Sequence, residues 1–486
     1  MQNRIIILFV LGLGFASSVN AQFSRYWNES FSTKAALLSG AVVGGYADET
    51  SIYYNPSILN DSSVNSLSFS NGLVKVDLIR YENAMGEGQD VENWESSVAS
   101  GFLSLNLYPK DKLGLVWKLA LFNKSKFDNS FKGEVRAEEN VFENVPGNEV
   151  YLGKVQSRTE YNDYWYGVGV AKKNNKRFNF GASFFLRYSS LRYTASKIVE
   201  VAPADTFSIL KRNSINNLSE DVRGYVWRGT IKLGVNYMLN KKVNLGLVVT
   251  TPSFALSGSS DVRTNVSFIN IVSKQVAGYL PDILADETVL GAGFNIKDPV
   301  SIAFGVDYHL DSYRWNCTVE WFGALKPYKM VDPEVGQRYS TAVPGSELKT
   351  DFSTYVAGGN SILNIAVGLE KTTKTDRSWL FGFKTDFDAL NNFDYKELSD
   401  GSTLVNTRSD YYHFSTGKNF MFLKYDVLFG IEYSLARVKN IQNFANFVPP
   451  IVIDSNNPYN LEGVVGNTMN FKGDAFVIFV GITLKN

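Results

Sequence analysis

The amino-acid sequence predicts an all-β protein: a transmembrane, antiparallel β-barrel of about 14 strands that holds an N-terminal plug inside its lumen. Three observations lead to this prediction. They are a secretory signal peptide, segments in which apolar residues alternate with small or polar ones, and links between these segments that are alternately short and long. The 486 residues include 26 Tyr, 34 Phe and 39 Gly but only 13 Pro, a composition that favours strands over helices.

Residues 1–21 have the pattern of a secretory signal peptide. Arg4 supplies a positive first region, residues 5–15 form an apolar core, and Val19-Asn20-Ala21 is a small-residue cleavage site. The mature chain would begin at Gln22, and no cysteine stands at this junction to carry a lipid anchor. We therefore expect an exported chain.

The composition excludes several classes of partner and chemistry. The 48 basic residues balance the 48 acidic ones, so no net charge attracts nucleic acid. The single cysteine, Cys317, cannot form an intramolecular disulfide. The two histidines, His309 and His413, stand outside any serine-elbow or metal-ligand spacing. We expect neither an enzyme nor a metal site, and no cofactor.

Alternation of apolar with small or polar residues marks the predicted strands. In residues 178–189 every second residue is apolar up to Tyr188, and Phe185 is the one large apolar residue on the other face. Residues 231–237 repeat the pattern, with lysine, glycine and asparagine on the second face. A period of two indicates a β-strand with two different faces. No run of eighteen apolar residues follows the signal peptide, which excludes membrane-spanning helices on length.

Short and long links alternate between the predicted strands, which distinguishes a barrel from a soluble β-sandwich. The short links are residues 109–112, 173–177, 240–242, 297–299, 373–378 and 417–422. The long links are residues 82–97, 127–160, 196–220, 254–285, 324–359, 388–408 and 437–473. Tight turns at one rim and long external loops at the other are typical of outer-membrane barrels. Six turns and seven loops join 14 strands within residues 64–486.

Residues 301–323 allow two interpretations. Apolar positions have even numbers before Asp311 and odd numbers after it. A β-bulge produces a one-residue shift of this kind, so we predict one long strand bulged near Asp311. The alternative is a hairpin at Asp311-Ser312 together with one further strand elsewhere.

Residues 22–63 precede the first predicted strand and form the predicted plug. Ser32 or Thr33 is a candidate N-cap of a short helix, and small residues follow that would let the backbone pack closely inside a narrow lumen. Asn55 precedes Pro56 and is therefore pushed out of the helical region, which ends any helix there. The alternative, a disordered tail, is disfavoured by the high apolar content of the segment.

One run in this segment carries a family resemblance. The residues Gly40, Ala41, Ala47, Asp48, Asn55, Pro56 and Ser57 resemble the N-terminal hatch of the FadL-like long-chain fatty acid and aromatic hydrocarbon transporters. Residues 243–258 and 279–296 look like two strand signatures of that family. Ser57 departs from the pattern, because the family usually has alanine there. We expect Tyr53 and Tyr54 to wedge this hatch against the barrel wall.

The resemblance implies a 14-strand barrel in the bacterial outer membrane and a route for a hydrophobic ligand, either a fatty acid or an aromatic hydrocarbon. External loops three and four would form an outer groove, with Phe207, Leu210, Phe254, Phe268 and Ile271 as ligand-binding residues. An inner pocket would lie at the mature N-terminus, where Phe23, Tyr26, Trp27 and Phe31 would cover an acyl chain. Arg25 or Lys34 is a candidate partner for a carboxylate head.

The resemblance further implies that the hatch occludes the lumen and that the ligand leaves sideways through a gap in the wall. The family's gap comes from a kink in the third strand, here about residues 113–126, where no glycine or proline marks such a kink. A non-specific porin, or a structural or adhesive barrel, is the alternative function. We expect outer-membrane lipids and a hydrophobic small molecule as partners, no nucleic acid, and a monomer.

Overall fold

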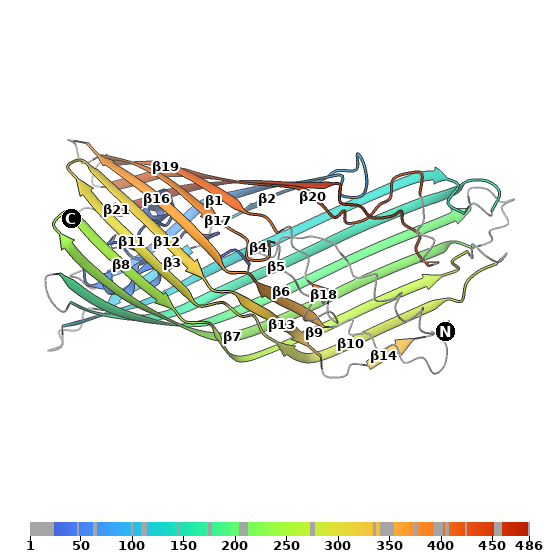
Figure 1. The fold of residues 1–486 in the computed structure, drawn as a ribbon, viewed down its shortest axis with the longest axis horizontal. Helices are drawn as coiled ribbons and strands as arrows, with labels where there is room; N and C mark the ends of the chain where they lie inside the picture. Colours follow the sequence, from blue (N-terminus) through green and yellow to red (C-terminus); the bar gives the residue numbers. More distant parts are fainter. Residues whose placement is uncertain are drawn as a thin grey trace.

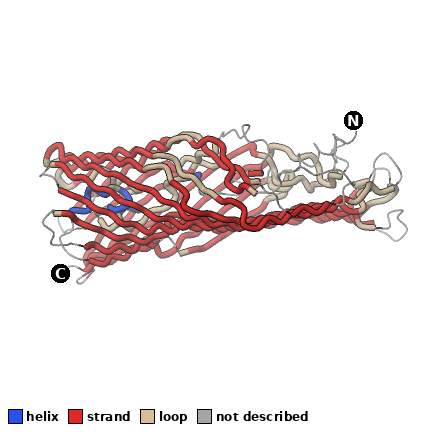
Figure 2. The backbone as a smooth tube through the Cα atoms, turned by 90° about the horizontal axis from the view of Figure 1, so that it is seen from below, coloured by secondary structure: helices blue, strands red, loops and turns tan. Residues whose placement is uncertain are grey.

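Strands make up almost all of the regular structure in the computed structural model (Figures 1 and 2). The described residues are 24–45, 48–61, 66–98, 101–107, 114–142, 145–173, 177–203, 212–272, 278–333, 337–340, 354–373, 377–391, 402–403, 408–422, 425–451 and 459–484. The predicted signal peptide, Phe23, Ala47, Phe207 and Leu210 lie outside these ranges. No helix in the described part of the chain is long and apolar enough to cross a membrane.

In the described residues, the helical elements precede all the strands. They are α2 (Thr33–Leu37), α3 (Ser51–Tyr54) and η3 (Pro56–Asp61). The strands are β1 (Ser66–Glu82), β2 (Val91–Ser97), β3 (Gly101–Leu107), β4 (Leu115–Glu139), β5 (Glu149–Lys173), β6 (Phe178–Pro203), β7 (Ser214–Asn240), β8 (Val243–Thr250), β9 (Phe254–Ile269), β10 (Ile283–Phe294), β11 (Ser301–Leu310), β12 (Tyr313–Phe322), β13 (Leu325–Asp332), β14 (Gln337–Ser340), β15 (Tyr355–Gly359), β16 (Ile362–Thr372), β17 (Ser378–Asp386), β18 (Ser402–Thr403), β19 (Tyr411–Phe422), β20 (Tyr425–Ile441) and β21 (Met469–Leu484).

A closed ring of antiparallel strands forms the barrel. From β1 the ladder runs through β3, β4, β5, β6, β7, β8, β11, β12, β16, β17, β19, β20 and β21. The last of these, β21, pairs with β1 again, for example at Val76↔Phe476. These fourteen described strands confirm the predicted barrel and its predicted size.

The predicted bulge near Asp311 is wrong, and the hairpin alternative is correct. Strands β11 and β12 pair from Ser301↔Phe322 to Leu310↔Tyr313 around a two-residue turn, and Asp311 has a φ of 49°. Partners across a two-residue turn have numbers of opposite parity, as in Ile302↔Trp321. A tight hairpin therefore produces the same switch from even to odd apolar positions that a bulge would produce.

The region that follows β8 also differs from the prediction. Residues 285–296, which were expected to cross the membrane, lie mostly in β10, whose partners are β9, β13 and β14 rather than strands of the ring. The predicted turn at 297–299 joins β10 to β11, and much of the predicted loop 254–285 is β9. Strand β9 pairs with β7 at Ile215 to Gly229, beyond the part of β7 that pairs with β8.

Other predicted external loops are shorter than expected because the ring strands continue beyond the barrel. Strand β4 reaches Glu139 and β5 begins at Glu149, so most of the predicted loop 127–160 is a two-stranded ladder. Figure 1 shows β4, β5, β6 and β7 extending far past the short strands β8 and β11. The sheet thus has a closed part and an extension on one side.

The two faces of the ring strands differ as the alternation predicts. Phe180 and Phe184 are 46% and 39% exposed on the outer face, whereas Phe185 is completely buried inside. In the extension the pattern reverses: Arg158 and Arg223 are exposed, and Val155 and Val222 belong to an enclosed apolar core. Exposed apolar side chains are most numerous on the closed part of the sheet, where they suit contact with lipid.

Candidate functional site

The N-terminal segment, defined as residues 24–45 and 48–61, packs against the inward side of the barrel strands. Ser32 precedes helix α2, and its Oγ accepts a hydrogen bond of 3.0 Å from the backbone N–H of Ala35. Ser32, one of the two predicted candidates, is thus the N-cap. Figures 1 and 2 place the helices nearer to the end of the molecule that carries the C-terminus.

Asp48 joins the two helices of this segment. Its carboxylate accepts a hydrogen bond of 2.6 Å from the Ser32 hydroxyl and one of 2.7 Å from the Thr50 backbone N–H. Lys118 of β4 donates to the backbone carbonyls of Asp48 and Glu49, each at 3.2 Å. Burial and, after it, the neighbouring charge of Asp48 together raise the pKa of the Glu49 carboxyl to about 7.

Asn55, Pro56 and Ser57 form a buried return in the chain. Asn55 is completely buried, and its Nδ2 donates a hydrogen bond of 2.9 Å to the carbonyl oxygen of Val43. Its Oδ1 accepts from the backbone N–H of Ser57 at 3.1 Å and from the Ser57 hydroxyl at 2.6 Å. The backbone of Asn55 is extended (φ −153°, ψ 102°), as expected before proline. The Ser57 hydroxyl, absent from the usual motif, therefore has a defined partner.

Glycines in the barrel wall make room for this segment. A Cβ on Gly234 would collide with Asn55, one on Gly246 with the Val43 carbonyl, and one on Gly305 with the backbone of Gly44. Further positions of the same kind, which also face the segment, are Gly181, Gly368, Gly382, Gly417 and Gly430. They lie on β6, β7, β8, β11, β16, β17, β19 and β20. The glycines on the second face of the sequence pattern thus mark where the segment touches the wall.

Polar side chains of the wall also hold the segment from different sides. Asn236 of β7 donates to the Gly44 carbonyl at 2.8 Å, and Ser183 of β6 donates to the Ile52 carbonyl at 2.9 Å. From the other side, Ser415 of β19 donates to the Leu37 carbonyl at 3.0 Å. Hydrogen bonds from several strands therefore satisfy backbone groups of the segment that no helix satisfies.

An aromatic cluster fixes the segment against β4, β5 and β6. The Tyr53 ring lies 5.5 Å from that of Phe122, 5.7 Å from that of Trp165 and 6.5 Å from that of Phe185. Phe31 packs 4.9 Å from Tyr53 on the same side. Phe185, which breaks the alternation in the sequence, thus contributes to this cluster. Tyr54 lies 5.1 Å from Tyr53 and packs against both this cluster and the apolar cluster that contains Leu37.

The predicted inner-pocket residues are partly brought together. Tyr26 stacks on Phe322 with ring centroids 4.5 Å apart, and Trp27 donates from Nε1 to Glu320 at 2.7 Å. Both line a cavity of about 30 Å³ that also touches Tyr53 and Gly40. Phe31 lies instead in the aromatic cluster. Their role as ligand contacts stays a prediction.

The predicted outer-groove residues do not share one surface. Phe254, at the start of β9, is 44% exposed and lies against Gly229 of β7. Phe268 and Ile271 are buried in the apolar core of the extension, where Phe268 packs 5.5 Å from Tyr459. A role for these three residues in ligand binding also stays a prediction.

A seam interrupts the barrel wall between β2 and β4. Strands β2 and β3 pair with β1 in one register, Lys75↔Ser97 and Asn71↔Gly101. Strand β3 pairs with β4 only as far as Phe102↔Phe122, and no backbone ladder joins β2 to β4 among the residues placed in the structure. Side chains bridge the two strands instead: Glu95 accepts from the Ser130 backbone N–H at 3.2 Å.

A bulge in β4 lies next to the point where the pairing of β3 with β4 ends. Asn123 pairs with Tyr164 and Ser125 with Asp163, so Lys124 is the extra residue. It turns inward, and its Nζ donates a hydrogen bond of 3.0 Å to the Tyr26 carbonyl. The irregularity falls within the third strand, where the resemblance places a kink. A bulge needs neither glycine nor proline, so no residue type marks its position in advance.

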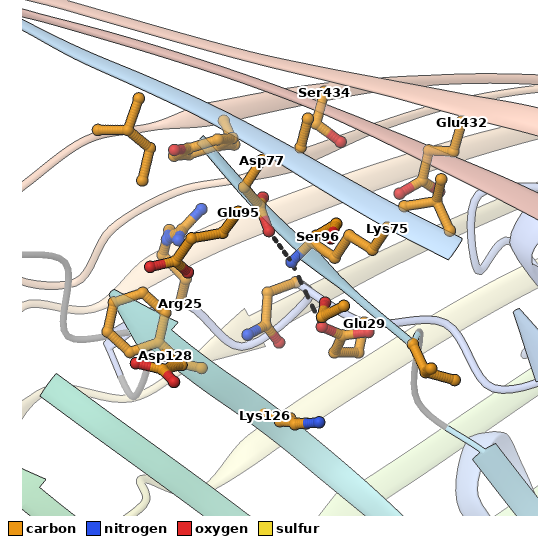
Figure 3. A pocket seen from close by; sticks show the side chains of 18 of the residues that line it. Arg25, Glu29, Lys75, Asp77, Glu95, Ser96, Lys126, Asp128, Glu432 and Ser434 are labelled. Carbon is orange, nitrogen blue, oxygen red and sulfur yellow. Dashed lines mark ion pairs between the residues drawn. The ribbon is translucent and has the colours of Figure 1, made fainter. Parts of the chain in front are cut away.

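A cavity of about 530 Å³ lies at the seam (Figure 3). Its lining reaches from Arg25 inside the barrel to Lys126 and Asp128 on β4. Figure 3 shows Lys75 between two carboxylates, with Asp77 at 3.5 Å and Glu29 at 3.7 Å. Burial raises the pKa of the Glu29 carboxyl, while the Lys75 ammonium acts in the opposite direction. The lining is mostly polar and charged.

A buried network of four charges lies deeper in the lumen. Asp298, in the link between β10 and β11, accepts from Arg187 and Arg228 at 2.5 Å each. Asp163 of β5 accepts from Arg187 at 2.6 Å. Both arginine side chains are at most 3% exposed. The only sign of this network in the sequence is that Arg187 stands on the second face of residues 178–189.

In the part of the chain that is placed, no group of three or more His, Cys, Asp or Glu is arranged to hold a metal ion. His413 instead shares a hydrogen bond of 2.6 Å with Ser434.

No protein-family model and no curated protein matches the sequence. Solved structures do match it. The P. putida toluene transporter TodX is similar over 94% of this chain and 100% of its own, with a TM-score of 0.51 and 13% identity. A Pseudomonas aeruginosa FadL homologue gives a TM-score of 0.52 at 11% identity, over 94% of this chain and 99% of its own.

The Ralstonia pickettii toluene transporter TbuX covers 93% of this chain and 98% of its own, with a TM-score of 0.50 and 9% identity. At such low identities the similarity concerns the fold. The chain therefore has the barrel fold of the FadL-like transporters that its sequence resembles.

Proposed function

We propose that this protein carries hydrophobic compounds, namely long-chain fatty acids or similar lipids or hydrocarbons, across the bacterial outer membrane by passive diffusion. Residues 22–63 act as a hatch in the lumen, and the ligand leaves sideways through the barrel wall. The observation that carries this proposal is the packing of the N-terminal segment against wall glycines on eight strands. The structures of similar fold, which include two described as toluene transporters, support a hydrophobic ligand.

The proposed role as a hatch is supported by contacts of the N-terminal segment with strands on opposite sides of the barrel. Leu37 lies against Gly417 and Gly430 on one side, and Val43 lies against Gly246 on the other. A straight water-filled path of the kind that a porin needs is hard to accommodate past these contacts. The hydrogen bonds of Asn55 then keep the segment folded on itself.

Release through the side of the barrel is supported by the seam between β2 and β4. A wall without a ladder lets a molecule pass between strands, and the cavity of about 530 Å³ lies at that interruption. An apolar ligand gains no free energy by entering the aqueous periplasm, whereas it does by entering the membrane. The lateral route therefore suits a hydrophobic compound.

The apolar outer face supports a location in the membrane, where lipid rather than another protein chain would cover it. Exposed aromatic and aliphatic residues cover the closed part of the barrel, for example Trp379 at 42% and Ile431 at 45% exposure. Lipid can cover such a band directly. We propose that the protein works as a monomer surrounded by outer-membrane lipids.

Two measurements test the proposed function. Native mass spectrometry of the protein purified in mild detergent should detect a co-purified hydrophobic molecule. Cells that lack their own long-chain transporter should regain uptake of radiolabelled oleate or toluene when they express this chain. A lumen that holds only water, together with uptake no faster than in control cells, would overturn the proposal and favour a structural barrel.

A further inference from the structure

A polar groove of about 700 Å³ crosses the outer face of the extension, from β4 to β10. Two rows of outward-facing side chains form its walls, and the strand register places the members of each row side by side. The first row is Ser130, Arg158, Thr194, Asp221 and Arg263, and the second is Lys132, Gln156, Ser196, Ser219, Asn265 and Asp286. Residues between the rows, such as Ala195 and Thr264, are buried on the inner side of the sheet. The floor of the groove is therefore backbone, and every side chain of these two walls is polar or charged.

An aromatic cluster on the same outer face separates the groove from the apolar side chains of the closed part. The ring of Tyr188 lies 5.0 Å from that of Trp227 and 6.3 Å from that of Tyr225. Tyr166 lies 6.2 Å from Trp227. Such rings are typical of the interface between membrane and water. Thr194 of the groove follows Tyr188 by six residues on β6, which is about 20 Å along a tilted strand. The groove therefore faces the layer just outside the hydrocarbon, where lipid headgroups lie.

Several cations on this face lack an acidic partner. Lys132 and Arg263 are exposed, and among the described residues neither has a carboxylate oxygen within 4.0 Å of its charged nitrogens. Arg192 has none there either, and it lies opposite Arg223 in the pairing of β6 with β7. Like charges opposite each other in a sheet are unfavourable. Of the two wall acids, Asp221 is already paired with Arg223 at 2.9 Å, so an anionic ligand would improve the charge balance.

We propose that this groove binds the headgroup of a phosphorylated, sugar-bearing lipid of the outer leaflet. The inference goes beyond transport and rests only on the outer-membrane location in the proposed function. The acyl chains of the lipid would lie along exposed apolar side chains of the barrel such as Phe184. Its phosphates would accept hydrogen bonds from Lys132, Arg192 and Arg263. Its sugar hydroxyls would exchange hydrogen bonds with the serine, threonine and amide side chains of the walls.

The size and the composition of the groove favour such a headgroup over other occupants. The rows cross five strands that are spaced about 4.8 Å apart, so the groove is about 20 Å long. A simple phospholipid headgroup would end near the aromatic cluster and leave most of this length empty, whereas a chain of several sugars would fill it. A protein partner would need an apolar centre in its interface, and the two walls offer none.

The experiment measures the binding of rough lipopolysaccharide, whose core sugars carry phosphates, to the full mature protein in detergent. Native mass spectrometry over a concentration series counts the bound lipid and gives its Kd. We expect the double variant Lys132→Gln/Arg263→Gln to weaken this binding by about tenfold or more, because each cation near an anionic lipid contributes to affinity. Enzymatic removal of the phosphates should weaken binding to the wild-type protein by a similar factor and abolish the difference between the two proteins. Phosphatidylglycerol should bind equally to both.

Lys241→Gln/Arg377→Gln is the matched control, because both residues are exposed in links at the other end of the barrel. This control should bind lipopolysaccharide as the wild-type protein does. Arg192→Gln is an independent variant and should weaken binding by about threefold or more.

Lipopolysaccharide binding that is unchanged in the groove variants, or weakened equally in the control, would overturn the proposed site. Equal weakening of phosphatidylglycerol would also overturn it, because the cations would then attract any anionic lipid. Oleate uptake by cells that express the wild-type chain tests the proposed function separately, so failure of the groove would leave transport standing.

Discussion

The side-chain amide of Asn55 donates a hydrogen bond of 2.9 Å to the carbonyl oxygen of Val43, twelve residues earlier in the chain. This contact ties the end of the N-terminal segment to its middle. Both residues also lie against the barrel wall, Asn55 at Gly234 and Val43 at Gly246. One buried hydrogen bond therefore couples the internal shape of the segment to its fit against the barrel wall.

Replacing Asn55 with alanine should loosen the segment and leave the barrel folded. The Val43 carbonyl and the Ser57 hydroxyl would lose their partner, at a cost of about 1–3 kcal/mol for each buried polar group left unsatisfied. Trypsin should then cleave after Arg25 or Lys34 faster than in the wild-type protein. Asn467→Ala, at an exposed position, is the control; equal cleavage rates in all three proteins would refute the role of Asn55.

Adding a methyl group at Gly246 should displace the segment from β8. The new Cβ would collide with the Val43 carbonyl, and overpacking of this kind costs about 1–3 kcal/mol. We expect a lower melting temperature for Gly246→Ala. Gly293→Ala serves as the control, because its Cβ would lie 3.7 Å from the nearest atom, the Asp332 carbonyl oxygen. A melting temperature lowered equally by both substitutions would contradict this account.

The charge of Asp298 should be essential to the stability of the folded barrel. Asp298→Asn would leave Arg187 and Arg228 buried with one carboxylate between them, and breaking a buried pair in this way costs about 3–5 kcal/mol. Asp221→Asn removes an exposed pair with Arg223 and should change stability by about 1 kcal/mol or less. Chemical unfolding in detergent compares the two. A similar small effect in both would show that the buried network contributes little.

The stability of the N-terminal segment should fall as pH rises toward neutrality. The pKa of Glu49 is raised to about 7 in the folded protein, first by burial and then by Asp48. An acid with a raised pKa holds its proton more tightly when folded, so its contribution is present below the ordinary pKa and is lost as pH rises through about 7. Protease protection measured between pH 5 and 8 should therefore decline, and Glu49→Gln should flatten the decline. An unchanged slope in that variant would exclude Glu49 as the cause.

The closed part of the barrel could be predicted because apolar side chains on the outer face and small or polar ones on the inner face impose a period of two. Phe180 and Phe184 carry that signal clearly. In the extension the faces reverse: polar residues such as Arg158 point outward and Val155 points inward. The sequence pattern of these strands therefore predicted external loops between membrane-crossing strands. At Asp311 a hairpin and a bulge give the same parity, and only the pairing of β11 with β8 and β12 separates them.

The site was predictable only where it depends on local sequence. The extended backbone at Asn55 and the N-cap at Ser32 follow from residue preferences. The Asp298 network depends on the register of strands that are far apart in sequence. Asp298 lies 111 residues from Arg187 in the sequence. The alternation within one strand does not predict which residue of a distant segment will contact it.

The most direct test of a barrel closed by its N-terminal segment is ion conductance in planar bilayers. The full mature chain should give little steady conductance. A variant that lacks residues 22–59 should still refold in detergent and should conduct strongly, because the contacts at Gly246, Gly305 and Gly430 would be gone. A large, steady conductance from the full chain, equal to that of the truncated chain, would contradict the account and identify an open pore.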